Sequence, residues 1–382
     1  IRDRCSASRA SLLTGSYSQR IGVRGAYNHT ARVGLNPNEI TIAEMLKSIG
    51  YATGIFGKWH LGDEEPYQPH TRGFDEAFIH GAGGIGQAYK CSCADAPGNK
   101  YFDPVIRYNG SFVKTKGFCT DLFFTAALGW IKAKKDGDEP FFAYITTNAP
   151  HGPMHAPEKF SAPYTKQGVN VANFLGMIAN IDHNVGQMRS FLKKEGLAED
   201  TIFIFTTDNG TSSGANIHNN GMRGRKGSEY DGGHRVPFIA RWPKNIKDGS
   251  TSKQTICLTD VIATCAALTG AKIPPNAAED SYNILQALLG QVGDNPIREY
   301  TLHQTIKLDL AIRHGNWKYL DHKGSGGNNY GREGEWGMKQ YALPERAPDA
   351  PGQLYDLATV SYTHLRAHET DSYLVCRLLL EK

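Results

Sequence analysis

The sequence predicts an α/β fold, with a large domain built on a mostly parallel central sheet flanked by helices and a small C-terminal domain with an antiparallel sheet. Two observations predict the large domain: its candidate strands are short and apolar throughout, and segments with helical periodicity separate them. Strands of this kind are buried on both faces, as in parallel sheets that helices cover. After residue 297 the pattern changes to short alternating strands, which are typical of an antiparallel sheet. We therefore predict domains over residues 1–297 and 298–359.

The helices of the large domain are marked by caps and by apolar spacing. The first is expected to begin at Cys5, where small residues lead into the apolar pair Leu12 and Leu13. Thr41 and Glu44 have the spacing of a capping box, so a second, short helix is expected to follow them. Two more helices are predicted over residues 259–268 and 282–289.

Apolar runs at residues 51–56, 141–145 and 202–205 are the predicted strands of the central sheet, and 236–242 is a further predicted strand. Because the carboxyl ends of parallel strands meet at one edge of a sheet, polar groups that follow the strands are expected to gather there. The first three runs are followed by such groups. They are Lys58 and His60, then His151, then Asp208 and Asn209.

The C-terminal part is expected to hold strands at residues 300–303, 308–313 and 317–320, followed by a long surface loop over 321–351. Residues 360–382 resemble the translation of sequencing adapters. We therefore expect a non-native, adapter-derived tail at 360–382 and an incomplete small domain before it.

Composition sets only loose limits on function. The chain has 382 residues, a formal net charge of +4 and seven cysteines. The weak positive charge suits an anionic substrate, but it also describes many ordinary enzymes. No apolar run is long enough to span a bilayer, and no nucleic-acid partner is expected. Cys257 and Cys265 are expected in the core, whereas Cys91, Cys93 and Cys119 are compatible with one disulfide and match no metal-binding spacing.

A thiol at a helix start lies among exposed N–H groups that favour negative charge. Arg9, four residues after Cys5, adds a permanent cation whose guanidinium binds oxyanions. This pattern has two interpretations: a reactive nucleophile, or a cysteine of lowered pKa without a catalytic role.

Lys58 and His60 lie two residues apart on an expected extended segment, so their side chains point the same way. An isolated pair of this kind is more often two surface residues without a functional role. Its place behind a buried strand, between Gly57 and Gly62, favours a site.

Asp208 and Asn209 offer hard oxygen donors that suit Ca²⁺ or Mg²⁺. An Asx turn closed by Gly210 would explain them equally well without a metal. His151 lies in a loop stiffened by prolines, which favours a fixed imidazole, with His155 as the competing histidine.

Several segments together resemble the signatures of the type I, formylglycine-dependent sulfatases of the alkaline phosphatase superfamily. These segments are CSASRASLLTG at residues 5–15, GIFGKWHLG at 54–62, PHGP at 150–153, TTDNG at 206–210 and GRKGSEYDGGHRVP at 224–237. Two positions depart from the family pattern: Ala7 stands where proline is frequent, and Asp231 replaces the usual glutamate. The resemblance extends over about residues 1 to 359.

The resemblance implies an arylsulfatase-like enzyme with an alkaline phosphatase-like fold, which releases inorganic sulfate from a sulfated carbohydrate or another sulfate ester. It implies that a formylglycine-generating enzyme or an anaerobic sulfatase-maturing enzyme converts Cys5 to formylglycine. It further implies that Asp208 and Asn209 bind Ca²⁺, with Mg²⁺ as the alternative, and that a first strand with two metal-binding aspartates is missing from this chain. The catalytic residues that the resemblance implies are Cys5, Arg9, Lys58, His60, His151 and Lys226.

In these roles Lys58 bridges the metal-bound oxygens and the aldehyde hydrate, and His60 contacts the second hydroxyl of the hydrate. His151 meets the oxygen of the leaving group, and Lys226 holds the sulfate. Family precedent suggests a periplasmic or secreted protein.

Two other functions remain open at this point. A phosphonate monoester or phosphodiester hydrolase would keep the formylglycine and the metal, and a sulfoglycan-binding protein would retain an unconverted Cys5. The sequence does not define the substrate. Candidate substrate contacts are His80, His303, Arg332 and Trp336, each equally well explained as an ordinary loop residue.

Overall fold

The computed structural model describes residues 5–27, 31–86, 95–96, 98–220, 222–293, 295–305, 308–322 and 351–358. The chain divides into two compact units, which are treated separately below. The larger unit comprises Cys5–Phe205 and Ile239–Asn295, and the smaller unit comprises Ile1–Arg4, Thr206–Phe238 and Pro296–Lys382.

The larger unit is built on a five-stranded sheet in the order β4-β3-β2-β1-β5. Strand β1 pairs in parallel with both β2 and β5, whereas β2, β3 and β4 pair antiparallel. The predicted α/β class is confirmed, and the central sheet is mixed because the β3–β4 hairpin extends one edge. The strands are β1 (Ala52–Lys58), β2 (Glu76–His80), β3 (Val105–Tyr108), β4 (Ser111–Lys114) and β5 (Phe141–Thr146).

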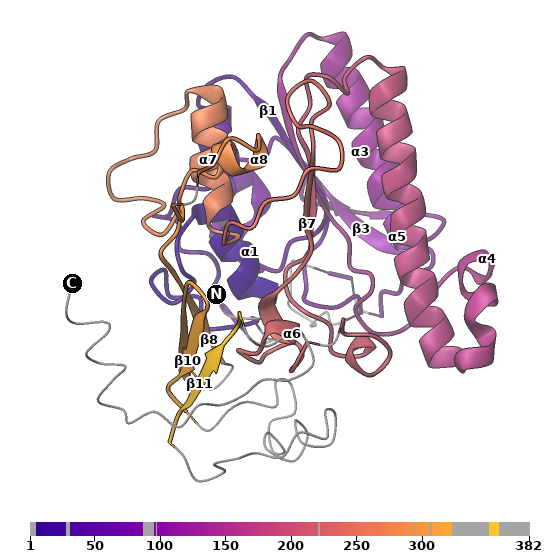
Figure 1. Ribbon diagram of the computed structural model, residues 1–382. Coiled ribbons are helices and arrows are strands. Elements are labelled where there is room, and N and C mark those ends of the chain that lie inside the picture. The colour runs from indigo at the N-terminus through magenta and orange to yellow at the C-terminus, as the bar shows by residue number, and fades with distance from the viewer. Residues whose placement is uncertain are drawn as a thin grey trace. The chain divides into compact units, whose positions relative to one another are not determined.

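Helices cover both faces of this sheet. The helices α3 (Cys119–Asp136) and α5 (Val169–Lys194) pack against each other on one face, and neither was among the predicted elements. On the other face lie α1 (Cys5–Thr14) and α7 (Asp260–Thr269), as Figure 1 shows. The short helix α2 (Ile42–Lys47) packs with them and against β1. Two buried apolar clusters fill these layers, one around Phe123 and Met177 and the other around Leu13 and Ile55.

Several local predictions are confirmed. Helix α1 begins at Cys5, and the capping box of α2 is formed in both directions between Thr41 and Glu44. Helix α8 (Leu285–Leu288) is shorter than predicted. The backbone N–H groups of Tyr282 and Ile284 donate to side chains of α7 instead of joining the helix. The remaining short elements are η1 (Glu65–Tyr67), η2 (Pro69–Arg72), α4 (Glu158–Ser161) and η3 (Ala162–Gln167).

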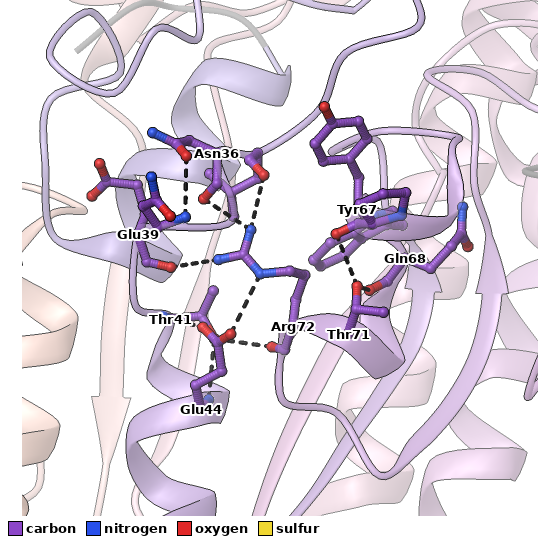
Figure 2. A network of polar contacts seen from close by, with 12 residues as sticks. Asn36, Glu39, Thr41, Glu44, Tyr67, Gln68, Thr71 and Arg72 are labelled. Carbon is purple, nitrogen blue, oxygen red and sulfur yellow. Dashed lines mark hydrogen bonds and ion pairs between the residues drawn. The ribbon is translucent and has the colours of Figure 1, made fainter.

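Arg72 is a buried cation that joins the segment before α2 to η2 (Figure 2). Its guanidinium donates to the backbone carbonyls of Leu35 at 2.9 Å, Asn36 at 3.1 Å and Glu39 at 2.5 Å. A fourth contact, of 3.5 Å, reaches the carboxylate of Glu44. The network fixes a stretch of chain that has no strand or helix of its own between residues 31 and 41.

The smaller unit contains a four-stranded antiparallel sheet in the order β11-β10-β9-β8. The three predicted strands are present, and β11 was not predicted. The strands are β8 (Tyr300–Gln304), β9 (Leu310–His314), β10 (Trp317–Leu320) and β11 (Gln353–Asp356). Tyr230 packs on the buried face of this sheet with Ala311, Leu320 and Tyr355. The unit also contains η4 (Gly214–Asn216) and α6 (Asp231–His234).

The strands β6 (Phe203–Thr206) and β7 (Phe238–Arg241) form a separate two-stranded sheet, so the prediction that the run 202–205 joins the central sheet was wrong. Cys119 is a buried free thiol, so it does not form the disulfide that the sequence left open for this residue. Cys91 and Cys93, and most of the predicted surface loop 321–351, lie outside the described residues. Cys257 is buried, as expected, and Cys265 is partly buried.

Candidate active site

Cys5 is the first residue of α1, and its side chain is buried. Arg9 follows one helical turn later, so it lies on the same side of the helix. Its guanidinium Nη1 donates a hydrogen bond of 2.8 Å to the backbone carbonyl of Lys58, at the end of β1. This bond fixes the start of α1 beside the carboxyl end of the strand.

The carbonyl of Lys58 also accepts a hydrogen bond of 2.8 Å from the Thr146 hydroxyl, at the end of β5. The parallel strands β1 and β5 approach closely here. Gly57 has φ of 125°, and a Cβ at this position would lie 1.8 Å from the carbonyl oxygen of Thr146. Only glycine fits this position, and it allows the two strands to approach closely. Lys58 and the loop after β5 therefore lie at one edge of the sheet, as the sequence predicted.

His60 is held from both ends. Its backbone N–H donates to the carbonyl of Gly81 at 2.8 Å, and its ring Nε2 lies 2.8 Å from the carbonyl of Tyr27. Because a carbonyl only accepts, Nε2 carries the proton and Nδ1 is the basic nitrogen. The N–H of Tyr27 in turn donates to the Ser6 hydroxyl, beside Cys5.

The pKa of His60 is lowered. Burial is the main cause, and the positive charge of Lys58 adds to it, while the Cys5 thiol acts in the opposite direction. A neutral imidazole with its basic nitrogen available is suited to accept a proton.

His151 follows β5 in a loop that contains the cis peptide bonds Ala149–Pro150 and Gly152–Pro153. Its ring Nδ1 donates to the carbonyl of Gly152 at 2.9 Å, so Nδ1 carries a proton in this structure. His155, the competing histidine, is exposed. The larger unit therefore brings together Cys5, Arg9, Lys58 and His60 at the start of α1 and the end of β1. His151 lies in the loop that follows the neighbouring strand β5.

His80 is buried and both of its ring nitrogens are engaged, Nε2 with the Asp95 carboxylate at 2.5 Å and Nδ1 with the Asn148 amide at 2.7 Å. The ring therefore has no nitrogen to offer a substrate in this structure. Its predicted role as a substrate contact does not fit this geometry.

In the smaller unit, Asp208 and Asn209 follow β6 directly. The N–H of Gly210 donates to the carbonyl of Gly233 at 2.7 Å, and a Cβ at Gly210 would lie 1.9 Å from the carbonyl oxygen of Gly232. The Gly-rich loop therefore packs against the Asp-Asn-Gly turn. The backbone N–H of Lys226 donates to the carbonyl of Thr211 at 3.0 Å, so Lys226 lies in the same part of this unit.

Asp208 and Asn209 offer a carboxylate and an amide oxygen, which fit the chemistry of a hard divalent cation. Two donors fall short of the six to eight oxygens that Ca²⁺ takes. Within the described residues, no group of three or more His, Cys, Asp or Glu side chains is arranged to hold a metal ion. The donors present are thus correct in kind and incomplete in number.

His303 is buried in the smaller unit, where its ring stacks on His234 with 3.8 Å between centroids. Lys318 donates to His234 at 2.6 Å and to Asp231 at 3.1 Å. Asp231 is therefore ion-paired with a buried lysine. Burial would raise its pKa, but the Lys318 charge holds that pKa well below its ordinary value. Arg332 and Trp336 lie outside the described residues.

Three residues that hold the site were not predicted: Ser6, Tyr27 and Thr146. Tyr27 acts through its backbone, which has no side-chain signature in the sequence. Thr146 is a strand-end hydroxyl, and it follows directly after a predicted strand. Its place between a strand and the His151 loop is the one signal that the sequence offers.

Comparison with known proteins gives a consistent result. A family model described as Sulfatase matches residues 2–271. N-acetylgalactosamine-6-sulfatase from Canis lupus familiaris is 32% identical over 313 residues, which are 78% of this chain and 59% of the relative. Arylsulfatase G from Mus musculus is 30% identical over 355 residues, which cover 80% of this chain and 65% of the relative. The chain thus spans less than two thirds of the length of these curated relatives.

Among solved structures, Ps i-CgsB in complex with k-i-k-neocarrahexaose superposes with a TM-score of 0.79 and 26% sequence identity. The superposition covers 99% of this chain and 80% of that one.

Proposed function

Because the chain belongs to the sulfatase family, we propose that it hydrolyses sulfate esters and releases inorganic sulfate. The observation that carries this proposal is the convergence of Cys5, Arg9, Lys58, His60 and His151 at one edge of the central sheet. Membership of the family implies a formylglycine and a divalent metal in general terms. For this chain we propose that Cys5 is the modified residue and that the metal is Ca²⁺, with Mg²⁺ as the alternative.

When present, a formylglycine at position 5 supplies the attacking oxygen, and a divalent cation supplies positive charge for the sulfate oxygens. The residues of the larger unit have the properties that such a reaction needs. Arg9 and Lys58 place positive charge beside position 5. His60, neutral and with Nδ1 basic, accepts a proton from the residue at position 5. His151, when protonated on both ring nitrogens, gives the proton on Nε2 to the departing alcohol and keeps the Nδ1 proton that binds the Gly152 carbonyl.

For the residues of the smaller unit, we propose the roles that the family resemblance implies. Lys226 binds the sulfate group, and Asp208 and Asn209 bind the metal. Among the described residues, these two supply only part of the ligands that the metal needs.

A sulfated carbohydrate is the proposed class of substrate. Two similar proteins support it by their names alone, an N-acetylgalactosamine-6-sulfatase and a protein solved with k-i-k-neocarrahexaose. We further propose that a formylglycine-generating or anaerobic sulfatase-maturing enzyme acts on Cys5, and that the protein works in the periplasm or outside the cell. Over the described residues, no helix is both long and apolar enough to cross a membrane.

The test has two parts, both on the full-length protein expressed together with a maturing enzyme. Peptide mass spectrometry across residue 5 is expected to show sulfur replaced by oxygen with loss of two hydrogens. Turnover of an aryl sulfate and of the matching aryl phosphodiester is then compared, and sulfate is expected to be preferred. His151→Ala is expected to lower turnover of a sulfated sugar, while His155→Ala, a matched change at the exposed neighbour, leaves it unchanged.

The two other candidate functions have distinct outcomes in the same experiment. Preference for the phosphodiester would indicate a phosphonate or phosphodiester hydrolase. An unmodified thiol after trials with more than one maturing enzyme would contradict the catalytic proposal and leave a binding protein.

A further inference from the structure

A chain of buried hydrogen bonds leads from Asp95 to the backbone of His151. The carboxylate of Asp95 contacts His80 Nε2 at 2.5 Å, and the amide nitrogen of Asn148 contacts His80 Nδ1 at 2.7 Å. The carbonyl of Asn148 accepts the N–H of His151 at 2.9 Å. Asp95, His80 and Asn148 are each no more than 3% exposed. This arrangement excludes bulk water, so every polar contact in the chain has to be made within the protein.

The direction of each hydrogen bond follows from its partners. An amide nitrogen only donates, so Nδ1 of His80 accepts and its Nε2–H donates to Asp95. Asp95 is fixed in turn, because Asn99 donates to its other oxygen at 2.6 Å and the N–H of Ala96 does so at 2.8 Å. The orientation of the Asn148 amide is therefore set by a carboxylate that is itself immobilised.

The topology of the sheet gives this chain a particular place. His80 is the last residue of β2 and pairs in register with Lys58 on β1, whereas Asn148 follows β5. Because β1 lies between β2 and β5, the His80–Asn148 hydrogen bond reaches across the end of the strand that carries Lys58. The loop of His151 is thereby tied to a strand that is not its neighbour.

A second buried group holds the other side of His151. The hydroxyl of Tyr101 donates to the carbonyl of His151 at 2.7 Å, and its ring is fully buried and stacks on Phe118 at 5.7 Å between centroids. Both backbone polar groups of His151 are therefore bound to buried partners. With Nδ1 bonded to the carbonyl of Gly152, the rotation of the imidazole is also restricted.

We propose that Asp95 and Tyr101 are positioning residues, which act through His80, Asn148 and the backbone of His151 to hold its Nε2 toward the leaving alcohol. This inference rests on the proposed role of His151 as proton donor. It gives His80 a role inside the protein in place of a contact with substrate.

The kinetic test uses two esters that differ in their need for a proton donor. An activated aryl sulfate releases a stable phenolate unaided, whereas an alkyl or sugar sulfate needs protonation of its oxygen. Asp95→Asn and Tyr101→Phe are expected to lower kcat on the sugar sulfate by about 10- to 100-fold and to change kcat on the aryl sulfate by less than about threefold. Tyr108→Phe, at an exposed tyrosine of β3, is the matched control and is expected to change neither rate.

A second measurement does not depend on turnover. Hydrogen exchange at the backbone amide of His151 is expected to be at least about tenfold faster in Asp95→Asn, with exchange in β1 unchanged. Equal fractional losses of kcat on the two esters would overturn the proposal, and so would unchanged exchange at His151. If the unaltered chain hydrolysed neither ester, the proposed function would fail, and exchange would still decide whether this chain of hydrogen bonds holds His151.

Discussion

Replacement of Arg72 by methionine is expected to destabilise the larger unit strongly, because the side chain is buried and supplies donors to four acceptors (Figure 2). The substitution keeps the apolar stem and removes the guanidinium. The carbonyl of Leu35 would then be buried without a donor, while those of Asn36 and Glu39, on partly buried residues, would regain some water. At about 1–3 kcal/mol for the buried carbonyl of Leu35 and about 0.5–1 kcal/mol for each of the two partly hydrated carbonyls, the expected loss in unfolding free energy is about 2–5 kcal/mol.

Urea unfolding followed by tryptophan fluorescence measures this loss. Trp59 is a suitable reporter, because it is buried and its indole N–H donates to the carbonyl of Tyr67 at 2.8 Å, just before Arg72 in the chain. Arg72→Lys keeps the charge with fewer donors and is expected to lose less than methionine does. Arg24→Met, at an exposed arginine, is the control and is expected to leave the midpoint unchanged. A loss below about 1 kcal/mol for Arg72→Met, at an unchanged denaturant slope, would refute the reasoning.

Three further predictions concern the two units. Gly57→Ala is expected to cost about 2–5 kcal/mol of unfolding free energy. A Cβ there would lie 1.8 Å from the carbonyl oxygen of Thr146, and the backbone conformation at this position disfavours alanine. A urea midpoint equal to that of the unaltered chain would count against this geometry. Burial lowers the pKa of both His234 and His303 well below the ordinary value of 6.5. The unfolded chain therefore binds more protons as the pH falls through 6.5, and stability present above that pH is lost below it. The urea midpoint should fall between about pH 7 and about pH 5, and His303→Phe, which keeps a ring to stack, should make the fall shallower; an equally steep fall in this variant would contradict the assignment. Removal of divalent metal with a chelator is expected to abolish sulfate release. Added Ca²⁺ should restore release in the unaltered protein but not in Asp208→Ala. Release that persists after chelation would exclude the proposed metal.

The sequence was most informative for polar side chains that follow an apolar strand and for helix starts, because both have a local pattern in the sequence. Lys58 and His60 follow one apolar run and His151 follows another, and the parallel pairing of β1 with β5 brings them to one edge of the sheet. That result follows from strand direction alone. The capping box at Thr41 and the helix start at Cys5 were equally local, so they needed no tertiary information.

The features that could not be predicted depend on backbone groups or on distant partners. The carbonyls of Tyr27 and Lys58 fix His60 and Arg9, and a carbonyl is present in every residue. His80 was a candidate substrate contact that the sequence explained equally well as an ordinary loop residue, and it is in fact the last residue of β2. Its actual partners, Asp95 and Asn148, are 15 and 68 residues away in the chain, and only the fold brings them together.

The burial of Cys5 sets a time limit on its chemical modification. The contacts that close the sheet edge around α1 join residues 49 and 88 positions apart, so they form only after much more of the chain has been made. At a synthesis rate of about 5–20 residues per second, Thr146 follows Cys5 out of the ribosome by roughly 7 to 28 seconds. During that interval Cys5 is part of a flexible peptide that a second enzyme can bind in extended form. Once α1 has docked, the thiol is enclosed in a rigid helix. A cell that folds this chain faster than it modifies it would therefore accumulate a well-folded protein with an unconverted thiol.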